Sequence, residues 1–355
     1  MTSKIYADNM VYSGNHLNTA VIGCAGSGKG YHYIRPNLKN EDGSNIFLVT
    51  ADKNYVEYIP EGYEITVLDF NELSSDVCYN PFHYIENEYD IRQLAHCMVT
   101  NVSRGKEKDE YFLDAWESLL CSAITYVHEK SENKTMSEVL EVLKQMYDNP
   151  GQRCDKNACL SLIVMLDLFQ ASTIKELMCK DAVHMDAFKN EQKQAFVIVL
   201  NRVDCSFDVI VNMIISQIKQ IVLKSKCKSH LKIMLDEFSR YYICDFPEFL
   251  AVCSTYNCSV DYCLQSICQL EAIYGKQCAY DILGFSNLVF LGTCSSADCQ
   301  YLAERFEEAK RKPLFHKTVG KKSMTPEKIM NLPMEKCIVF INGEKPYIQK
   351  KYTDE

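Results

Sequence analysis

The segment that most constrains the fold of this 355-residue chain is a short apolar stretch that runs directly into a glycine-rich loop. Residues 18–23 read NTAVIG, which is typical of a buried β-strand, and GCAGSGKG continues over residues 23–30. The following YHYIRPNL predicts a helix that Pro36 ends or kinks. A strand, a glycine loop and a helix in this order match a phosphate-binding loop, because glycines let backbone N–H groups turn toward an anion at the helix N-terminus.

The loop predicts a nucleotide site that binds ATP with magnesium. Lys29 is expected to reach the β- and γ-phosphate oxygens. The position after this lysine usually carries a Ser or Thr that gives its hydroxyl to magnesium, but here it is Gly30. A plain glycine turn between a strand and a helix remains the alternative interpretation. The residues predicted to bind the nucleotide are Gly23, Gly26, Ser27, Gly28, Lys29, Gly30 and Tyr31.

Two further segments predict the catalytic groups of a nucleotide hydrolase. The apolar run that begins at Leu231 ends in Asp236 and Glu237. We predict that Asp236 orders the magnesium shell and that Glu237 takes a proton from the attacking water, although solvated acids at a strand end are common. Gln265 follows the predicted strand Ser259 to Leu264, where nucleotide motors of the RecA-like class carry a polar residue that senses the γ-phosphate. This last prediction depends on the first two.

Alternation of short apolar runs with helical patterns predicts an α/β fold with a mainly parallel sheet. Residues 86–192 contain helical patterns and no convincing strand, which predicts an all-α domain inserted between the two parts of the nucleotide-binding domain, residues 1–85 and 193–355. A helix is expected over Val209 to Lys224. The predicted strands are Asn18 to Gly23, Asn45 to Thr50, Tyr63 to Leu68, Ala195 to Leu200, Leu231 to Leu235, Ser259 to Leu264, Leu288 to Leu291 and Cys337 to Ile341.

Composition narrows the classes of function. The formal net charge is −9, from 47 acidic and 38 basic residues, so any grip on nucleic acid must come from a local patch or an assembled pore. A chain of this length does not need disulfides to hold a core, and its 18 cysteines indicate a reducing compartment. Neither a signal peptide nor an apolar run long enough for a membrane helix is present, which predicts a soluble, cytoplasmic chain.

With these motifs in order, the chain resembles the coupling-protein ATPases of type IV secretion and conjugation, the TraG/TraD-like family. The likeness extends over residues 17–352 and includes segments outside the nucleotide motifs. The segments that carry it are GKGYHYIRPNL, TADKN, CYNPFHYIENEYDI, YFLDAWESLLCSAITYV, LDEFSRYYICDFPEFL, LQSICQLEAIYG and MTPEKIMNLPMEKCIVFINGEKPYIQKKY.

This resemblance implies a RecA-like, P-loop nucleotide-binding domain that carries an all-helical domain and assembles as a hexameric ring. ATP hydrolysis would drive a DNA–relaxase complex or a protein substrate to the secretion channel. The implied partners are single-stranded DNA or the relaxase–DNA complex, channel components and further copies of the chain. The implied location is the inner face of the cell membrane, reached through partners or an anchor. Many members of the family carry glycine after the loop lysine, and magnesium would then be held by Asp236 through water and by the phosphates.

Three departures from the family pattern leave a competing hypothesis open. The chain shows no membrane anchor, and its helical segment is short between Asp167 and Gln194. The segment STYNCS at 254–259, where the family carries a basic residue that acts as an arginine finger, has no Arg or Lys; Arg240 and Arg305 are substitutes to which we assign no role. The competing hypothesis is a degenerate nucleotide-binding adaptor or DNA-binding subunit with little or no hydrolysis. A DNA translocase similar to FtsK and HerA is a weaker alternative.

Overall fold

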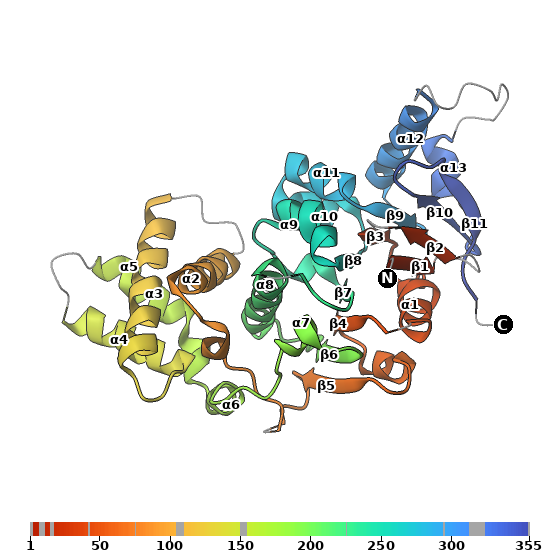
Figure 1. Ribbon diagram of the computed structural model, residues 1–355. Coiled ribbons are helices and arrows are strands. Elements are labelled where there is room, and N and C mark those ends of the chain that lie inside the picture. Colours follow the sequence, from red (N-terminus) through yellow and green to blue (C-terminus); the bar gives the residue numbers. More distant parts are fainter. Residues whose placement is uncertain are drawn as a thin grey trace.

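An α/β body and a group of helices that projects from one side of it make up the molecule (Figure 1). The computed structural model describes residues 3–6, 11–14 and 18–353, apart from residues 42, 75, 104–109, 150–154, 225, 294 and 312–323. In the described chain nine strands form one sheet, and β1 and β2 pair separately as an antiparallel two-stranded sheet. These two strands are Ser3–Tyr6 and Val11–Gly14.

The large sheet is mainly parallel, as the alternation of strands and helices predicts. The parallel pairing runs without interruption from β9 through β3, β8, β7, β4 and β6 to β5. Strands β10 and β11 extend this sheet in antiparallel pairing beyond β9. In sheet order the strands are β11 (Tyr347–Lys350), β10 (Lys336–Phe340), β9 (Asn287–Phe290), β3 (Thr19–Ile22), β8 (Cys258–Leu264), β7 (Leu231–Leu235), β4 (Asn45–Thr50), β6 (Gln194–Val199) and β5 (Glu64–Asp69).

All eight predicted strands are present, and their observed ends differ from the predicted ones by at most one residue. The expected helix over Val209 to Lys224 is α8 (Asp208–Lys224). Of the two outcomes predicted for Pro36, an end of the helix is wrong, because a π-helical turn, η1 (Gly30–Ile34), passes into α1 (Arg35–Lys39); a kink stays a prediction. Pro36 lies in the first turn of α1 and has no N–H, and the residue before it, Arg35, donates its N–H to the Gly30 carbonyl in the π-helical pattern.

Helices cover both faces of the sheet, which explains why its central strands are apolar throughout. In β4, Phe47 and Val49 belong to the core cluster that includes α8, whereas Ile46 and Leu48 pack in the cluster that includes α1. All four side chains are fully buried. The remaining helices of the α/β body are η2 (Lys53–Tyr58), η5 (Phe238–Arg240), α9 (Phe246–Val252), η6 (Cys253–Tyr256), α10 (Ile267–Tyr274), α11 (Lys276–Gly284), α12 (Ser296–Arg311) and α13 (Pro326–Met330).

Every described element between β5 and β6 is a helix, in agreement with the helical periodicity of this segment. The longest described one, α3, has 21 residues, and within the described ranges no helix is both long and apolar enough to span a bilayer. The domain limits at residues 85/86 and 192/193 stay a prediction. The helices of this segment are η3 (Pro81–Tyr84), α2 (Glu88–Ser103), α3 (Glu110–Lys130), α4 (Met136–Asp148), α5 (Lys156–Met165), η4 (Asp167–Gln170), α6 (Ser172–Leu177) and α7 (Ala187–Asn190).

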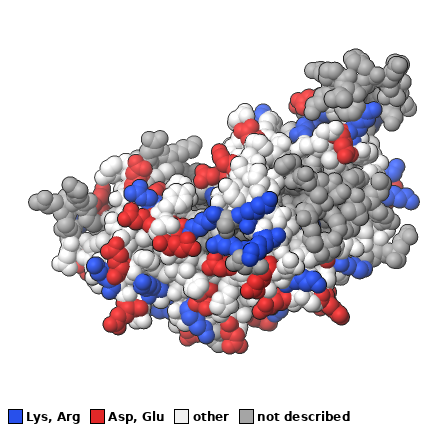
Figure 2. Space-filling model, viewed as in Figure 1, with Lys and Arg blue, Asp and Glu red and all other residues white. Residues whose placement is uncertain are grey.

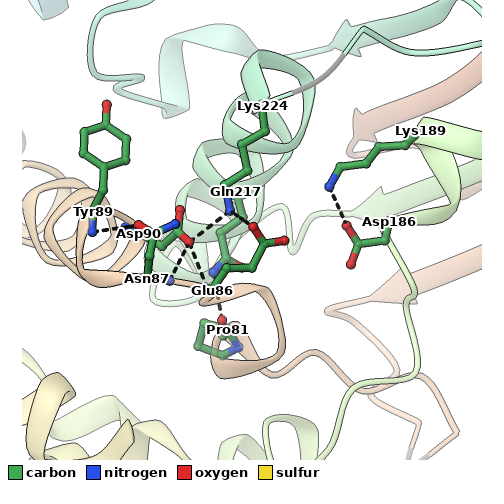
Figure 3. Close-up of polar contacts among 9 residues, drawn as sticks. All are labelled: Pro81, Glu86, Asn87, Tyr89, Asp90, Asp186, Lys189, Gln217 and Lys224. Carbon is green, nitrogen blue, oxygen red and sulfur yellow. Dashed lines mark hydrogen bonds and ion pairs between the residues drawn. The ribbon is translucent and has the colours of Figure 1, made fainter.

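Helix α8 ties the helical segment to the sheet (Figure 3). The last residue of α8 is Lys224, and its Nζ lies 2.9 Å from both Glu86 Oε2, just before α2, and Asp90 Oδ2, in the first turn of α2. Earlier in α8, the Gln217 side chain donates a hydrogen bond to the Pro81 carbonyl at 2.9 Å. Asp90 is only 2% exposed, so loss of the Lys224 ammonium would leave a buried carboxylate without this charged partner.

Candidate nucleotide-binding site

The predicted nucleotide residues meet at one edge of the sheet, where the parallel strands β3, β8, β7 and β4 all end. The N–H of Gly23, which follows β3, donates to the carbonyl of Leu264 at the end of β8 at 3.0 Å. The N–H of Asp236, which follows β7, donates to the Val49 carbonyl in β4 at 2.8 Å. The carboxyl edge of a parallel sheet is where α/β proteins bind their ligands.

The loop adopts a backbone conformation that requires glycine. Gly26 and Gly28 have φ angles of +77° and +86°, which side-chain-bearing residues rarely adopt. A Cβ at residue 28 would also overlap the imidazole of His32. Ser27 lies between these glycines, and its buried Oγ has no hydrogen-bond partner among the described residues. An unpartnered buried hydroxyl inside a glycine loop fits a phosphate group, which accepts hydrogen bonds.

Lys29 closes the loop upon itself in this structure. Its Nζ donates to the Gly23 carbonyl at 2.7 Å and is half-buried. The positive charge of Lys29 acts on Asp236, whose carboxyl group lies across the same edge. The ammonium group therefore lies within the loop, and its reach to phosphate oxygens stays a prediction.

Asp236 and Glu237 occupy different environments although they are adjacent in the chain. Asp236 is 9% exposed, and its carboxylate accepts hydrogen bonds from Thr50 Oγ1 at 3.2 Å and from the Glu237 N–H at 3.1 Å. Burial, then the negative charge of Glu237, raises the pKa of Asp236 to about 6. Glu237 is more accessible and has a left-handed backbone with φ of 54°. For a non-glycine residue this conformation costs about 1–2 kcal/mol and is often found at functional sites.

Gln265 lies directly after β8, beside the strand that carries the two carboxylates. Its backbone N–H donates to Gln269 Oε1 at 3.0 Å. Its side-chain amide forms no hydrogen bond with any residue that the structure describes, so it is available to a ligand. The sensor role proposed for it remains untested by the geometry.

Both arginines considered as substitutes for an arginine finger are engaged elsewhere. Arg240 makes two hydrogen bonds to the Asp208 carboxylate, the shorter at 2.6 Å, and a third to the Asn201 carbonyl. Arg305 stacks on Tyr301 and Phe340 and donates to the Tyr301 hydroxyl at 3.1 Å. Neither guanidinium is free in this structure.

Two residues at the site were missed by the sequence reasoning. Thr50, which orients Asp236, is the last residue of the predicted strand Asn45 to Thr50 and the first of the segment TADKN, to which the resemblance assigned no role. Lys351, in the segment YIQKKY, donates to the Ser27 carbonyl at 3.0 Å. Only the resemblance of this terminal block to the family drew attention to it, and that resemblance assigned no role to Lys351.

The sequence matches a family model over nearly its whole length. The model described as type IV secretory system conjugative DNA transfer matches residues 2–164 and 160–353. The chain belongs to this family. A comparison with curated proteins gives no match.

Three solved structures share the fold of this chain. The bacterial conjugative coupling protein TrwBdeltaN70, in a trigonal form with sulphate, has a TM-score of 0.76 at 16% identity over 96% of this chain and 86% of that one. Plasmid coupling protein TrwB in complex with ADP and Mg2+ gives 0.75 at 15% identity over 96% and 85% of the two chains. VirB4 of Thermoanaerobacter pseudethanolicus gives 0.68 at 12% identity over 99% and 96%. At these identities the likeness shows the fold, and it agrees with the predicted RecA-like α/β class.

Proposed function

We propose that this conjugative DNA-transfer protein is an ATP-driven coupling motor, which delivers a DNA–relaxase complex or a protein substrate to a type IV secretion channel. The observation that carries the proposal is the meeting of the glycine loop with Asp236 and Glu237 at one sheet edge, in a chain of this family. The TrwB structure with ADP and Mg2+, which has the same fold, supports a nucleotide at this edge.

Different residues of the chain would have different roles in hydrolysis. Backbone N–H groups of residues 23–31 and the Lys29 ammonium hold the phosphates. Asp236 would hold magnesium through water, Glu237 would take the proton of the attacking water, and Gln265 would contact the γ-phosphate. Bound magnesium would neutralise charge that develops on the phosphates. The more accessible position of Glu237 suits proton transfer, whereas the buried Asp236 suits a fixed ligand.

The partners proposed are single-stranded DNA or the relaxase–DNA complex, channel components and further copies of the chain in a hexameric ring. On the face shown in Figure 2, Lys and Arg side chains gather near the middle, over the region of α7 and α8 in Figure 1, with acidic side chains around them. This distribution supports DNA binding by a local basic patch and not by the charge of the whole molecule. Together with the net charge of −9, this favours DNA contact through a limited surface of the assembled ring.

A second candidate is an adaptor that binds nucleotide without useful turnover. Its supporting observation is the lack of a basic residue in 254–259, with Arg240 and Arg305 both engaged by other groups. A transition-state cation is worth several orders of magnitude in the rate of phosphoryl transfer. Without a cation from another chain or partner, turnover would be slow.

ATP hydrolysis with and without single-stranded DNA tests the motor directly. Wild type would be measured beside Lys29→Ala and Glu237→Gln, at concentrations that permit assembly. Lys53→Ala is the matched control, because Lys53 is an exposed lysine at the same edge and pairs with Asp69 at 2.9 Å. We expect both site variants, and not Lys53→Ala, to lose turnover by more than about a hundredfold. Wild-type turnover no faster than that of Lys29→Ala would refute the motor, and nucleotide binding without turnover would favour the adaptor.

A further inference from the structure

The glycine at the end of the phosphate loop is required by a tyrosine from another element. Gly30 stands where the loop pattern has Ser or Thr. A Cβ at this position would overlap the hydroxyl of Tyr55 and lie 3.1 Å from its Cζ. A Ser or Thr side chain at residue 30 and the observed position of Tyr55 therefore exclude each other. The Tyr55 hydroxyl takes up the space in which the usual loop hydroxyl would begin.

Tyr55 is held in this position by its own short helix. It lies in η2, whose preceding residue Asp52 accepts a hydrogen bond from the Asn54 N–H at 3.1 Å and caps the helix. The ring is only 6% exposed, and the Arg35 guanidinium lies 5.9 Å from its centroid. The hydroxyl itself forms no hydrogen bond with any described residue. A well-held ring with an unpaired hydroxyl is what a ligand-directed group needs.

Tyr55 also lies close enough to Asp236, the residue predicted to hold magnesium, to feel its charge. Helix η2 follows β4, whose last residue Thr50 hydrogen-bonds Asp236. Burial and then the negative charge of Asp236 raise the pKa of Tyr55, so the phenol stays neutral near pH 7. Thr50 offers the other hydroxyl nearby, but it is fully buried, donates to Asp236 and accepts from the Asp52 N–H at 3.0 Å. Thr50 is therefore committed to orienting the carboxylate.

We propose that the Tyr55 hydroxyl replaces the loop hydroxyl that Gly30 lacks and contacts the water shell of the nucleotide-bound magnesium ion. This rests on the proposed function, because it assumes that the loop binds ATP with magnesium. Magnesium usually keeps several waters in protein sites, so a neutral phenol serves as a hydrogen-bond partner of such a water. Tyr55 is thus a positioning residue for the metal and not a group that reacts.

The test measures the affinity of a fluorescent ADP analogue in magnesium and in EDTA. Tyr55→Phe removes the hydroxyl and keeps the ring under Arg35. We expect the strengthening of affinity by magnesium to fall by about tenfold, since one hydrogen bond at a charged centre is worth about that factor, while affinity in EDTA changes by less than about twofold. Tyr58→Phe is the matched control, because Tyr58 lies on the same helix and its ring also faces Arg35, at 5.0 Å.

Variants at residue 30 distinguish a loss of affinity caused by the missing hydroxyl from one caused by altered packing. Gly30→Ser alone should weaken binding in both conditions, because its Cβ overlaps the Tyr55 hydroxyl. Gly30→Ser combined with Tyr55→Phe supplies a loop hydroxyl and removes the overlap with the phenol oxygen. The Cβ at residue 30 then lies 3.1 Å from the ring Cζ, which a shift of a few tenths of an ångström relieves, so the magnesium effect should return in part. If Tyr55→Phe leaves the effect of magnesium on affinity unchanged, or lowers affinity equally in magnesium and in EDTA, the role assigned to Tyr55 is wrong, but the proposed function still stands. A wild-type protein that binds no nucleotide overturns the assignment and the proposed function together.

Discussion

The ammonium of Lys351 donates a hydrogen bond to the carbonyl of Ser27 at 3.0 Å, across 324 residues of sequence. Ser27 lies between the two glycines of positive φ in the phosphate loop, so this contact holds the most unusual part of its backbone. The next residue reinforces the contact, because the Tyr352 carbonyl lies 2.6 Å from Nδ1 of His32. Lys351 is 6% exposed and directly follows β11, the edge strand of the sheet. The end of the described chain therefore helps to shape the nucleotide site.

Lys351→Met should weaken nucleotide binding. The variant keeps most of the buried aliphatic volume but leaves the Ser27 carbonyl without its charged donor, an interaction worth about 1.5–3 kcal/mol. We expect affinity for a fluorescent ATP analogue to fall by about tenfold and amide hydrogen exchange in residues 23–30 to become faster. Lys350→Met is the control, because Lys350 is exposed. Unchanged exchange in the loop would show that Lys351 does not order it.

Arg240→Met should destabilise the fold instead of selectively removing catalysis. Arg240 and Asp208 form a shielded pair at 2.6 Å, and removal of either charged group takes this ion pair away from the other. We expect Arg240→Met and Asp208→Asn each to lower the free energy of unfolding by about 2 kcal/mol, and the double variant to be little worse than either single one. Urea unfolding of the four proteins checks this coupling. Full stability of Arg240→Met combined with lost turnover would instead support Arg240 as the arginine finger.

His230 should make the fold less stable in mild acid. It is 7% exposed, and its Nε2 lies 2.9 Å from Ser259 Oγ. Burial, followed by the charge of Lys232 and opposed by that of Glu41, lowers the pKa of His230 to about 4. The unfolded chain therefore binds the proton first, and the stability present above pH 6.5 is lost as the pH falls toward 4.

The comparison that isolates this effect is wild type against His230→Gln. Asp236 and Asp261 have pKa values raised to about 6, and such carboxyl groups add stability as the pH falls, so wild type alone would show a mixture. Between pH 7.5 and pH 5, wild type should lose about 2 kcal/mol more of its free energy of unfolding than His230→Gln does, as measured by urea unfolding. Parallel pH profiles of the two proteins would contradict the buried, neutral histidine.

Local patterns in the sequence were enough to predict much of the fold. Strands β3, β4 and β7 are short apolar runs buried on both faces of the sheet, and such runs are visible without knowledge of their neighbours. The glycine loop and the carboxylates after β7 were likewise recognisable, because their chemistry requires particular residue types at fixed spacing. Strand β11 was not predicted. It lies at the edge of the sheet, its side chains are exposed except for a partly buried Gln349, and it therefore has no run of apolar residues that would indicate a strand.

The sequence by itself determined the class of fold, the positions of most strands and the residues that could bind a phosphate, because each depends on neighbours a few positions apart. The tertiary structure alone decided that Lys351 caps the loop, that Tyr55 excludes a side chain at Gly30, and that Asp208 engages Arg240. These pairs lie far apart in the chain or on different elements. They meet only because the order of strands in the sheet and the packing of helices on its faces bring them together, and no local pattern encodes that order.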